Sequence, residues 1–359
     1  MDKAANSLLI GSVEASSGKS TLLLGLAQNL TERGLKICFG KPVAQSFVES
    51  SLDQDVQVIR KALDLAEDQI KPPIALLSNQ SLNEVLTHDG TSMAQKAFEN
   101  YGPGALEGFG LFEGPATIDE GRLLGLSLAQ LAQTLDAPVL LTVRYHNLEL
   151  VDTILSAQDR LGDRLLGVVL NDVPLKHHET VQSSVVPYLE RHQIPVFGLL
   201  PHRDLLRSVS VAELVRQLDA EVLCCPNRLN LMVGQLSIGA MNANSALKFF
   251  RRGSNMAVVT GGARTDIQLA ALESATHCLI LTGHVLHNDI MIKRAENLEV
   301  PVLSVTLDTL STVEIIESAF QHARFHESVK VDCIRDLVKE TIDTERIAQL
   351  LGLSLSTSE

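Results

Sequence analysis

The sequence predicts an α/β fold: a parallel, doubly wound sheet with helices on both faces, followed by a smaller α/β domain. Short apolar runs alternate with helical patterns along most of the chain, as in βαβ units. The first run, 8–10, is apolar throughout, as expected of a strand buried on both faces. A glycine-containing loop, 11–21, joins this run to a helix, and polar residues follow several later runs.

In the first half, each apolar run is an expected strand and each helical pattern between runs is an expected helix. The expected strands are 8–10, 35–39, 108–113, 138–143, 166–170 and 194–200. The expected helices are 22–33, 56–66, 92–100, 123–135, 150–161 and 181–191. Val56, Ile59 and Leu63 form one apolar stripe on the second helix. The segment 72–80, which begins with two prolines, is expected to be irregular.

The loop 11–21 has features of a phosphate-binding loop (P-loop). In such loops, backbone N–H groups and the positive end of the following helix converge on an anion, a lysine reaches the terminal phosphates, and a hydroxyl binds magnesium. Gly18, Lys19 and Ser20 supply these groups here. The complete pattern has a glycine where this chain has Val13. The match therefore concerns the Gly-Lys-Ser end, whose place between a strand and a helix favours nucleotide binding over a plain connection.

Polar side chains stand at the ends of several expected strands, among them Lys41, Glu113 and Asn171. The ligand crevice of a parallel sheet lies outside the carboxyl ends of its strands, so we expect these side chains near the loop. Lys41 taken alone fits a solvated loop lysine, whereas Glu113 suits a magnesium site and Asn171 suits contact with a base edge. Asp53 and Asp55 stand at the start of the second helix, where an acid serves either as a cap or in binding magnesium or substrate.

Composition and charge narrow the function classes. The net charge is −13 without a cluster of basic residues, and tryptophan is absent, so no nucleic-acid partner is expected. The apolar runs are too short to span a membrane and the N-terminus lacks a signal-peptide pattern, so we expect a cytoplasmic protein without a membrane partner. The five cysteines lack metal-binding spacing and are expected to be reduced and structural.

Two domains are expected, because 359 residues with 45% hydrophobic content suit two better than one. We divide the chain into 1–225 and 226–359. Strand–helix units follow this boundary and predict a small three-layer domain. The domain is expected to begin with the run 229–234. Its expected strands are 256–260, 278–283 and 300–305, and its expected helices are 267–274, 289–297 and 313–323.

Residues 7 to about 215 resemble the dethiobiotin-synthetase-like domain at the N-terminus of long bacterial phosphate acetyltransferases. That domain is related to dethiobiotin synthetase and to cobyrinate amidating enzymes. The matching stretches are SSGKS (16–20), FGKPVAQ (39–45), FEG (112–114), GVVLN (167–171) and GLLP (198–201). The resemblance implies a P-loop domain that binds ATP and Mg²⁺.

Residue roles follow from this resemblance. Lys19 and Lys41 would be catalytic, with Lys41 facing the substrate. The implied metal ligands are Ser20, Asp55 (or Asp53) and Glu113. The implied nucleotide-binding residues are Glu14, Ser16, Ser17, Gly18, Lys19, Ser20, Thr21, Asn171 (near adenine) and Pro201. Dethiobiotin synthetase carries other residues at the positions of 12–15 and 115–116, which argues against biotin synthesis.

The second half resembles the DRTGG domain, which accompanies the same N-terminal domain in phosphate acetyltransferases and also occurs in some regulatory phosphohydrolases. The matching stretch is GGARTDIQLAAL at 261–272, with Ala263 where family members often carry aspartate. Its glycine pair opens a helix either as a structural connection or as an anion-binding nest for a regulatory ligand. The sequence is compatible with three roles for Arg264: it caps the helix, pairs with Asp266 or binds a phosphate.

Three functions stay open on the sequence. The first is a regulatory protein whose first domain binds ATP and magnesium and hydrolyses ATP slowly or not at all, while the second binds a small-molecule effector or dimerises. The second is an ATP-dependent ligase that phosphorylates a carboxyl or carbamate group held by Lys41. The third is a scaffold without ATP affinity, which Val13 favours. The resemblance also implies a homodimer. It covers only the accessory part of the long acetyltransferases, so acetyl transfer by this polypeptide alone is not expected.

Overall fold

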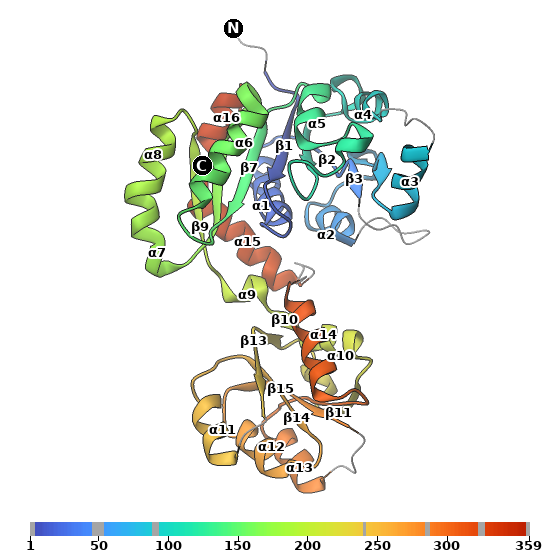
Figure 1. Cartoon of the computed structure of the whole chain (residues 1–359), viewed down its shortest axis with the longest axis vertical. Coiled ribbons are helices and arrows are strands. Elements are labelled where there is room, and N and C mark those ends of the chain that lie inside the picture. The colour runs from blue at the N-terminus through green and yellow to red at the C-terminus, as the bar shows by residue number, and fades with distance from the viewer. Residues whose placement is uncertain are drawn as a thin grey trace. The chain divides into compact units, whose positions relative to one another are not determined.

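The computed structural model describes residues 4–44, 54–87, 93–239, 242–283, 288–321 and 327–356 (Figure 1). The chain forms two compact units. The first consists of Met1–His202 and Phe325–Glu359, and the second of Arg203–Arg324. This grouping differs from the sequence-based division at residue 225, because the second unit begins earlier and the last segment of the chain returns to the first unit.

A parallel sheet with the strand order β4-β2-β6-β1-β7-β8-β9 forms the centre of the first unit. Its strands are β1 (Ser7–Ser12), β2 (Ile37–Gly40), β4 (Ile70–Lys71), β6 (Phe109–Glu113), β7 (Val139–Arg144), β8 (Leu165–Val173) and β9 (Val196–Pro201). A separate ladder joins β3 (Val43–Ala44) to β5 (Ala75–Leu76). The central strand β1 pairs in parallel with β6 and β7, so the carboxyl ends of these three strands meet at one edge.

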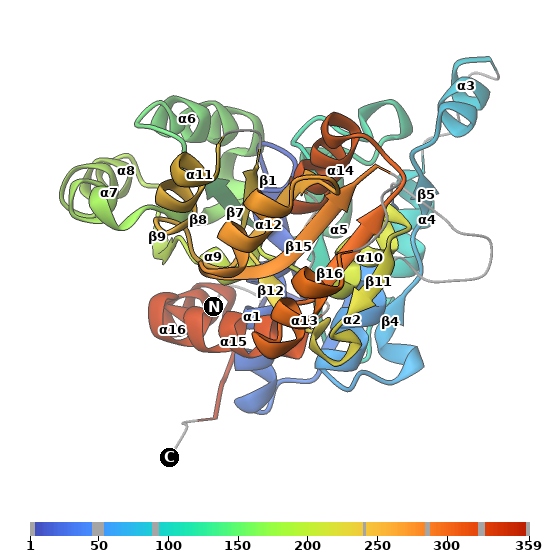
Figure 2. The ribbon, with the colours of Figure 1, turned by 90° about the horizontal axis from the view of Figure 1, so that it is seen from below.

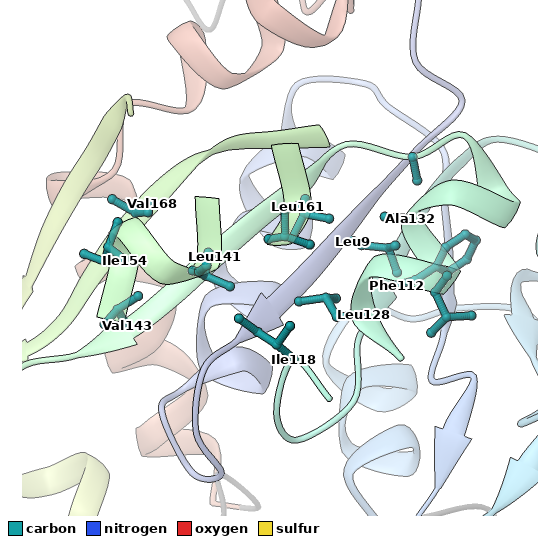
Figure 3. Close-up of a cluster of buried hydrophobic side chains, with 14 of the residues drawn as sticks. Leu9, Phe112, Ile118, Leu128, Ala132, Leu141, Val143, Ile154, Leu161 and Val168 are labelled. Atoms are coloured by element: carbon teal, nitrogen blue, oxygen red, sulfur yellow. The ribbon is translucent and has the colours of Figure 1, made fainter. Parts of the chain in front are cut away.

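Helices cover both faces of this sheet, which confirms the predicted fold class. They are α1 (Lys19–Glu32), α2 (Gln54–Ala62), α3 (Asn79–Thr87), α4 (Ala94–Tyr101), α5 (Leu128–Leu135), α6 (Leu150–Leu161), α7 (Leu175–Thr180), α8 (Val186–Arg191), α15 (Ser328–Thr341) and α16 (Thr344–Leu351). Figure 3 shows one face, where Leu128 of α5 and Ile154 of α6 pack with Leu9 and Leu141 of the sheet. The helices α1 and α15 lie behind the sheet in the same view.

The predicted helix 123–135 is wrong over its first part. A single 3-10 turn, η3 (Arg122–Leu124), ends at Gly125, which is left-handed with φ 75°. The helix α5 begins only after Ser127, whose side chain accepts a hydrogen bond from the backbone N–H of Gln130. A glycine followed closely by an N-capping serine is the local signal for this break.

The last helices, α15 and α16, complete the first unit and were not predicted. The helix α15 lies along α1 at Gly25, where a Cβ would come within 2.4 Å of Val338 Cγ2. Beyond α15, Ile342 forms an antiparallel bridge with Gly198 of the edge strand β9. This segment therefore covers one face of the sheet and also part of its outer edge.

A five-stranded sheet of order β11-β16-β15-β14-β13 forms the centre of the second unit. Its strands are β11 (Glu221–Cys224), β13 (Gln235–Ile238), β14 (Met256–Gly261), β15 (Thr276–Thr282) and β16 (Val302–Val305). A small ladder pairs β10 (Val209–Ser210) with β12 (Met232–Val233). The strands β13 to β16 are parallel, with β15 and β16 side by side in Figure 2, and β11 is antiparallel to β16.

Helices of the second unit form a layer on each face of its sheet, as the predicted three-layer domain requires. They are α9 (Asp204–Arg207), α10 (Val211–Leu218), α11 (Ala243–Phe250), α12 (Thr265–Leu272), α13 (Asp289–Asn297) and α14 (Thr309–Gln321). One core joins α11, α12 and α13 to the sheet, and another joins α10 and α14. The short strand β12 lies within the run 229–234. In either unit, no helix within the described ranges has the length and apolar character needed to cross a bilayer.

Candidate functional site

The loop between β1 and α1 turns sharply at two left-handed residues. Ser16 has φ 56° and Gly18 has φ 94°. Gly18 stands directly before α1, so its conformation directs the first turn of the helix back over the end of β1. Glycine is the residue that adopts this conformation without steric cost. The loop thus has the sharp turn into a helix that backbone anion sites use.

Side chains of two neighbouring strands, β7 and β8, donate hydrogen bonds to this loop. The side-chain nitrogen of Asn171, in β8, donates a hydrogen bond to the carbonyl oxygen of Ser17 at 2.8 Å. The hydroxyl of Thr142, in β7, donates to the same oxygen at 3.3 Å. Within the loop, the hydroxyl of Ser17 donates to the carbonyl oxygen of Glu14 at 2.6 Å. The loop is therefore fixed by side chains at the carboxyl ends of β7 and β8.

Lys19 begins α1 and is almost completely buried, with 7% of its surface exposed. Its ammonium group donates to the hydroxyl of Ser12 at 2.8 Å and to the carbonyl oxygen of Ala116 at 3.4 Å. Burial lowers the pKa of Lys19, while the negative charge of Glu113 acts in the opposite direction. The positive charge of Lys19 is thus stabilised by hydrogen bonds to two neutral oxygens and by nearby acids at the carboxyl edge of the sheet.

Glu113 ends β6 and is also buried. Its Oε1 lies 3.6 Å from the ammonium nitrogen of Lys41, which follows β2. Its Oε2 is buried and accepts no hydrogen bond from any described residue. A carboxylate oxygen without a partner suits Mg²⁺, which prefers oxygen ligands and is commonly held by one or two carboxylates plus phosphate oxygens.

Few predicted residues other than Glu113 could serve as magnesium ligands. Ser20 lies in the first turn of α1. Asp53 lies outside the described residues, and Asp55 lies in α2 without a described side chain. Over the described ranges, no group of three or more His, Cys, Asp or Glu side chains could hold a metal ion by itself. A metal here would therefore need ligands from a bound phosphate chain.

Other predicted nucleotide-binding residues are spread more widely along the edge. Thr21 follows Ser20 in α1. The carboxylate of Glu14 lies 2.8 Å from Nε2 of His146, which follows β7. Pro201 ends β9, the edge strand beyond β8. The structure thus brings Gly18, Lys19, Glu113 and Lys41 together with Asn171, while Pro201 stands at the far end of the same edge.

Several residues at this edge were missed by the sequence reasoning. Ser12 ends β1, so the rule that located Asn171 could have found it, whereas Thr142 lies inside β7. Ala116 and Glu120 lie in the loop after β6, where no sequence signal marks them. His146 is likewise brought to the loop only by the order of the strands.

Comparison with known proteins gives matches to both halves of the chain. A sequence profile of the AAA domain matches residues 6–210, and a profile of the DRTGG domain matches residues 213–319. Phosphate acetyltransferase of Nitrosomonas europaea is 24% identical over 360 residues, covering 93% of this chain and 50% of that protein. Cobyrinate a,c-diamide synthase of Methanosarcina barkeri is 27% identical over 212 residues, covering 58% of this chain and 38% of that protein.

Among solved structures, the CBS and DRTGG regulatory region of Clostridium perfringens pyrophosphatase, complexed with its activator diadenosine tetraphosphate, is 18% identical. It covers 44% of this chain and 76% of that chain with a TM-score of 0.30, too low for any conclusion to pass between the two proteins. The chain spans about half the length of the phosphate acetyltransferases that it matches. Since the AAA-domain profile matches more than half of its residues, this chain belongs to that family, AAA_26, and carries a DRTGG domain after it.

Proposed function

We propose that this chain is a cytoplasmic regulatory protein whose first unit binds ATP together with Mg²⁺ and hydrolyses it slowly or not at all. The observation that carries this proposal is the position of Lys19. Its ammonium group lies at the turn into α1, beside a buried carboxylate, Glu113, one oxygen of which accepts no hydrogen bond from the described part of the chain. A lysine and an acid at the end of a left-handed turn are the groups needed to hold a magnesium–phosphate chain.

Each residue has a distinct role in this proposal. Backbone N–H groups of the loop, from Glu14 to Thr21, meet the phosphates, and Lys19 meets the terminal ones. Ser20 and Glu113 approach the metal, with Asp55 as a further ligand. Asn171 supports the loop and faces the adenine, which extends toward Pro201. The second unit binds a small-molecule effector, and the chain forms a homodimer.

Calorimetric titration with Mg-ATP tests the proposal. We expect wild-type protein to bind, and Lys19→Ala to weaken binding at least about a hundredfold, because charge-assisted hydrogen bonds to phosphate are lost. Lys36→Ala is the matched control, since Lys36 is exposed and pairs only weakly with Glu107 at 3.4 Å. Equal affinity of wild type and the Lys19 variant would refute the proposal. No binding by either would favour the scaffold function.

A second candidate function, an ATP-dependent ligase acting on a small carboxylate or carbamate, is favoured by Lys41. Its ammonium group lies 3.6 Å from Glu113, and only 16% of its side-chain surface is exposed. A lysine held at the phosphate end of the site has the charge needed to bind an acid beside the terminal phosphate. This proposal predicts that small carboxylic acids stimulate ATP turnover at least about tenfold. Lys41→Met should remove the stimulation while ATP affinity stays close to that of the wild type.

A further inference from the structure

The loop that follows Glu113 passes directly over Lys19. Its closest approach is Ala116, whose carbonyl oxygen accepts hydrogen bonds from the hydroxyl of Ser12 at 2.9 Å and from the ammonium group of Lys19 at 3.4 Å. Ser12 also accepts the shorter hydrogen bond of Lys19. The ammonium group is therefore held between the end of β1 and the peptide of Ala116.

The other side of the Ala116 residue is held by an acid. Its backbone N–H donates a hydrogen bond to the carboxylate of Glu120. The backbone N–H of Glu120 in turn donates to the hydroxyl of Thr117 at 3.1 Å. Glu120 thus fixes the orientation of the Ala116 backbone, and with it the direction of the carbonyl oxygen that meets Lys19.

The loop is anchored in the core, and this restricts the orientation of the Ala116 backbone. Ile118, which Figure 3 shows beside Leu128, is buried, and its carbonyl oxygen accepts a hydrogen bond from the backbone N–H of Leu128 at 3.1 Å. Gly121 then reverses the chain in a left-handed conformation, with φ 80°. A shift of the Ala116 peptide therefore requires the loss of a specific contact within 116–120 rather than movement of the whole loop.

We propose that Glu120 is a positioning residue for nucleotide phosphates, acting through the backbone of Ala116 to hold the ammonium group of Lys19 where the terminal phosphates bind. This inference rests on the proposed function, because it assigns the means by which the same site places its lysine. It also explains why an acid stands in this loop. A carboxylate is a stronger acceptor than a neutral group, so it holds the N–H of Ala116 firmly.

Titration with nucleotides of different phosphate number tests the proposal. Lysine in such loops reaches the β- and γ-phosphates, so ATP and ADP report on its position and AMP does not. Glu120→Ala removes the acceptor of the Ala116 N–H and should weaken Mg-ATP and Mg-ADP binding roughly tenfold, with AMP affinity unchanged. Glu120→Gln keeps an acceptor oxygen and should restore affinity to within about threefold of the wild type.

Two further variants complete the design. Asp119→Ala removes the neighbouring acid, whose carboxylate is exposed and pairs with Arg160 and Arg122. It should bind all three nucleotides like the wild type. Ser12→Ala removes the hydroxyl that meets Ala116 from the opposite side, and it should reproduce the loss for ATP and ADP with AMP unchanged.

The outcomes separate the inference from the proposed function. If wild-type protein binds no nucleotide, the proposed function itself is wrong. If the wild type binds but Glu120→Ala binds ATP equally well, or loses AMP as strongly as ATP, only the positioning role is refuted. If Glu120→Ala does not fold, Ser12→Ala and Glu120→Gln still test the inference. Wild-type ATP affinity in Ser12→Ala would overturn it. A tenfold loss of ATP affinity in Glu120→Gln would overturn it as well.

Discussion

The side-chain amide of Asn171 donates a hydrogen bond to the carbonyl oxygen of Ser17, and this contact joins β8 to the loop before α1. The strand β8 is not a neighbour of β1, the strand that leads into this loop, since β7 lies between them. A Cβ added to Gly18 would lie 2.1 Å from the same amide nitrogen. The amide and the loop therefore fit together only with glycine at this position.

Removal of the Asn171 amide should loosen the loop and weaken nucleotide binding. We expect Asn171→Ala to lower Mg-ATP affinity roughly tenfold, because one well-formed hydrogen bond to the loop backbone is lost. Asn171→Asp should be worse, since a carboxylate repels the carbonyl oxygen of Ser17. Asn147→Ala is the control, because the side chain of Asn147 is exposed and, among the described residues, its hydrogen bonds go to nearby Glu149. Calorimetric titration of the variants measures the effect, and unchanged affinity in both Asn171 variants would contradict it.

The charge of Glu113 should determine how strongly magnesium supports binding. Wild-type protein is expected to bind ATP more tightly with Mg²⁺ than with an excess of chelator. In Glu113→Gln the ratio of the two affinities should fall toward one, because a neutral amide is a poor magnesium ligand. The variant also leaves Lys19 and Lys41 without the carboxylate between them, so its affinity for magnesium-free ATP should not fall. A ratio equal to that of the wild type would exclude Glu113 from the metal site.

Strand ends were predictable because a buried parallel strand has a distinctive apolar run and a polar residue after it. Lys41, Glu113 and Asn171 were found in this way, and Gly18 was found through the Gly-Lys-Ser motif. Ser12 obeys the same rule and Thr142 lies inside β7, but both are small polar residues of a kind that also occurs within strands. Their contribution follows from their contacts, which depend on the register of three strands.

The parts that sequence reasoning missed depend on long-range contacts. Glu120 is an ordinary loop acid until the chain turns back at Gly121 and its carboxylate meets the N–H of Ala116. The sequence of α15 and α16 has a helical pattern, but this pattern does not indicate which of the two sheets the helices cover. Gly25 in the middle of α1 looks like a weak point of a helix, yet α15 lies so close there that an added Cβ would come within 2.4 Å of Val338 Cγ2.

The ion pair between Glu190 and Arg346 should make the attachment of α16 depend on pH. Arg346 donates hydrogen bonds to both carboxylate oxygens of Glu190, at 2.8 and 3.0 Å, and these lower the pKa of Glu190 below its ordinary value of 4.5. The pair therefore stabilises the fold above pH 4.5, and this stabilisation is lost as the pH falls through the lowered value. Because both side chains are about one third exposed, we expect no more than about 1 kcal/mol.

Amide hydrogen exchange in α16 measures this effect locally, which matters because a chain of two units need not unfold in one step. Glu190→Gln should speed exchange in α16 at pH 7, and its difference from the wild type should be smaller near pH 3, after correction for intrinsic exchange rates. Glu213→Gln, which removes an exposed pair with Arg216 in the second unit, is the control. A difference between the Glu190 variant and the wild type that is the same at both pH values would contradict the prediction.

Gly25 provides a test of whether α15 packs on α1 as described. In an isolated helix, Gly25→Ala would stabilise by about 1 kcal/mol, because alanine has the higher helix propensity. In this structure the new Cβ would lie 2.4 Å from Val338 Cγ2, 2.7 Å from its Cβ and 3.2 Å from the carbonyl oxygen of Ile334. Overpacking of this kind costs about 1–3 kcal/mol, which exceeds the gain in propensity.

We therefore expect Gly25→Ala to lower the melting temperature of the full chain. Val338→Ala, which is itself destabilising because it leaves a cavity, should cost less in the Gly25→Ala background than in the wild type. Gly104→Ala is the matched control: no heavy atom lies within 4 Å of its added Cβ, so it should leave the melting temperature nearly unchanged. Calorimetric scans of the wild type, the two single variants and the double variant give the double-mutant cycle. If Gly25→Ala stabilises the protein, or if the two substitutions are additive, α15 does not lie against α1 at this point.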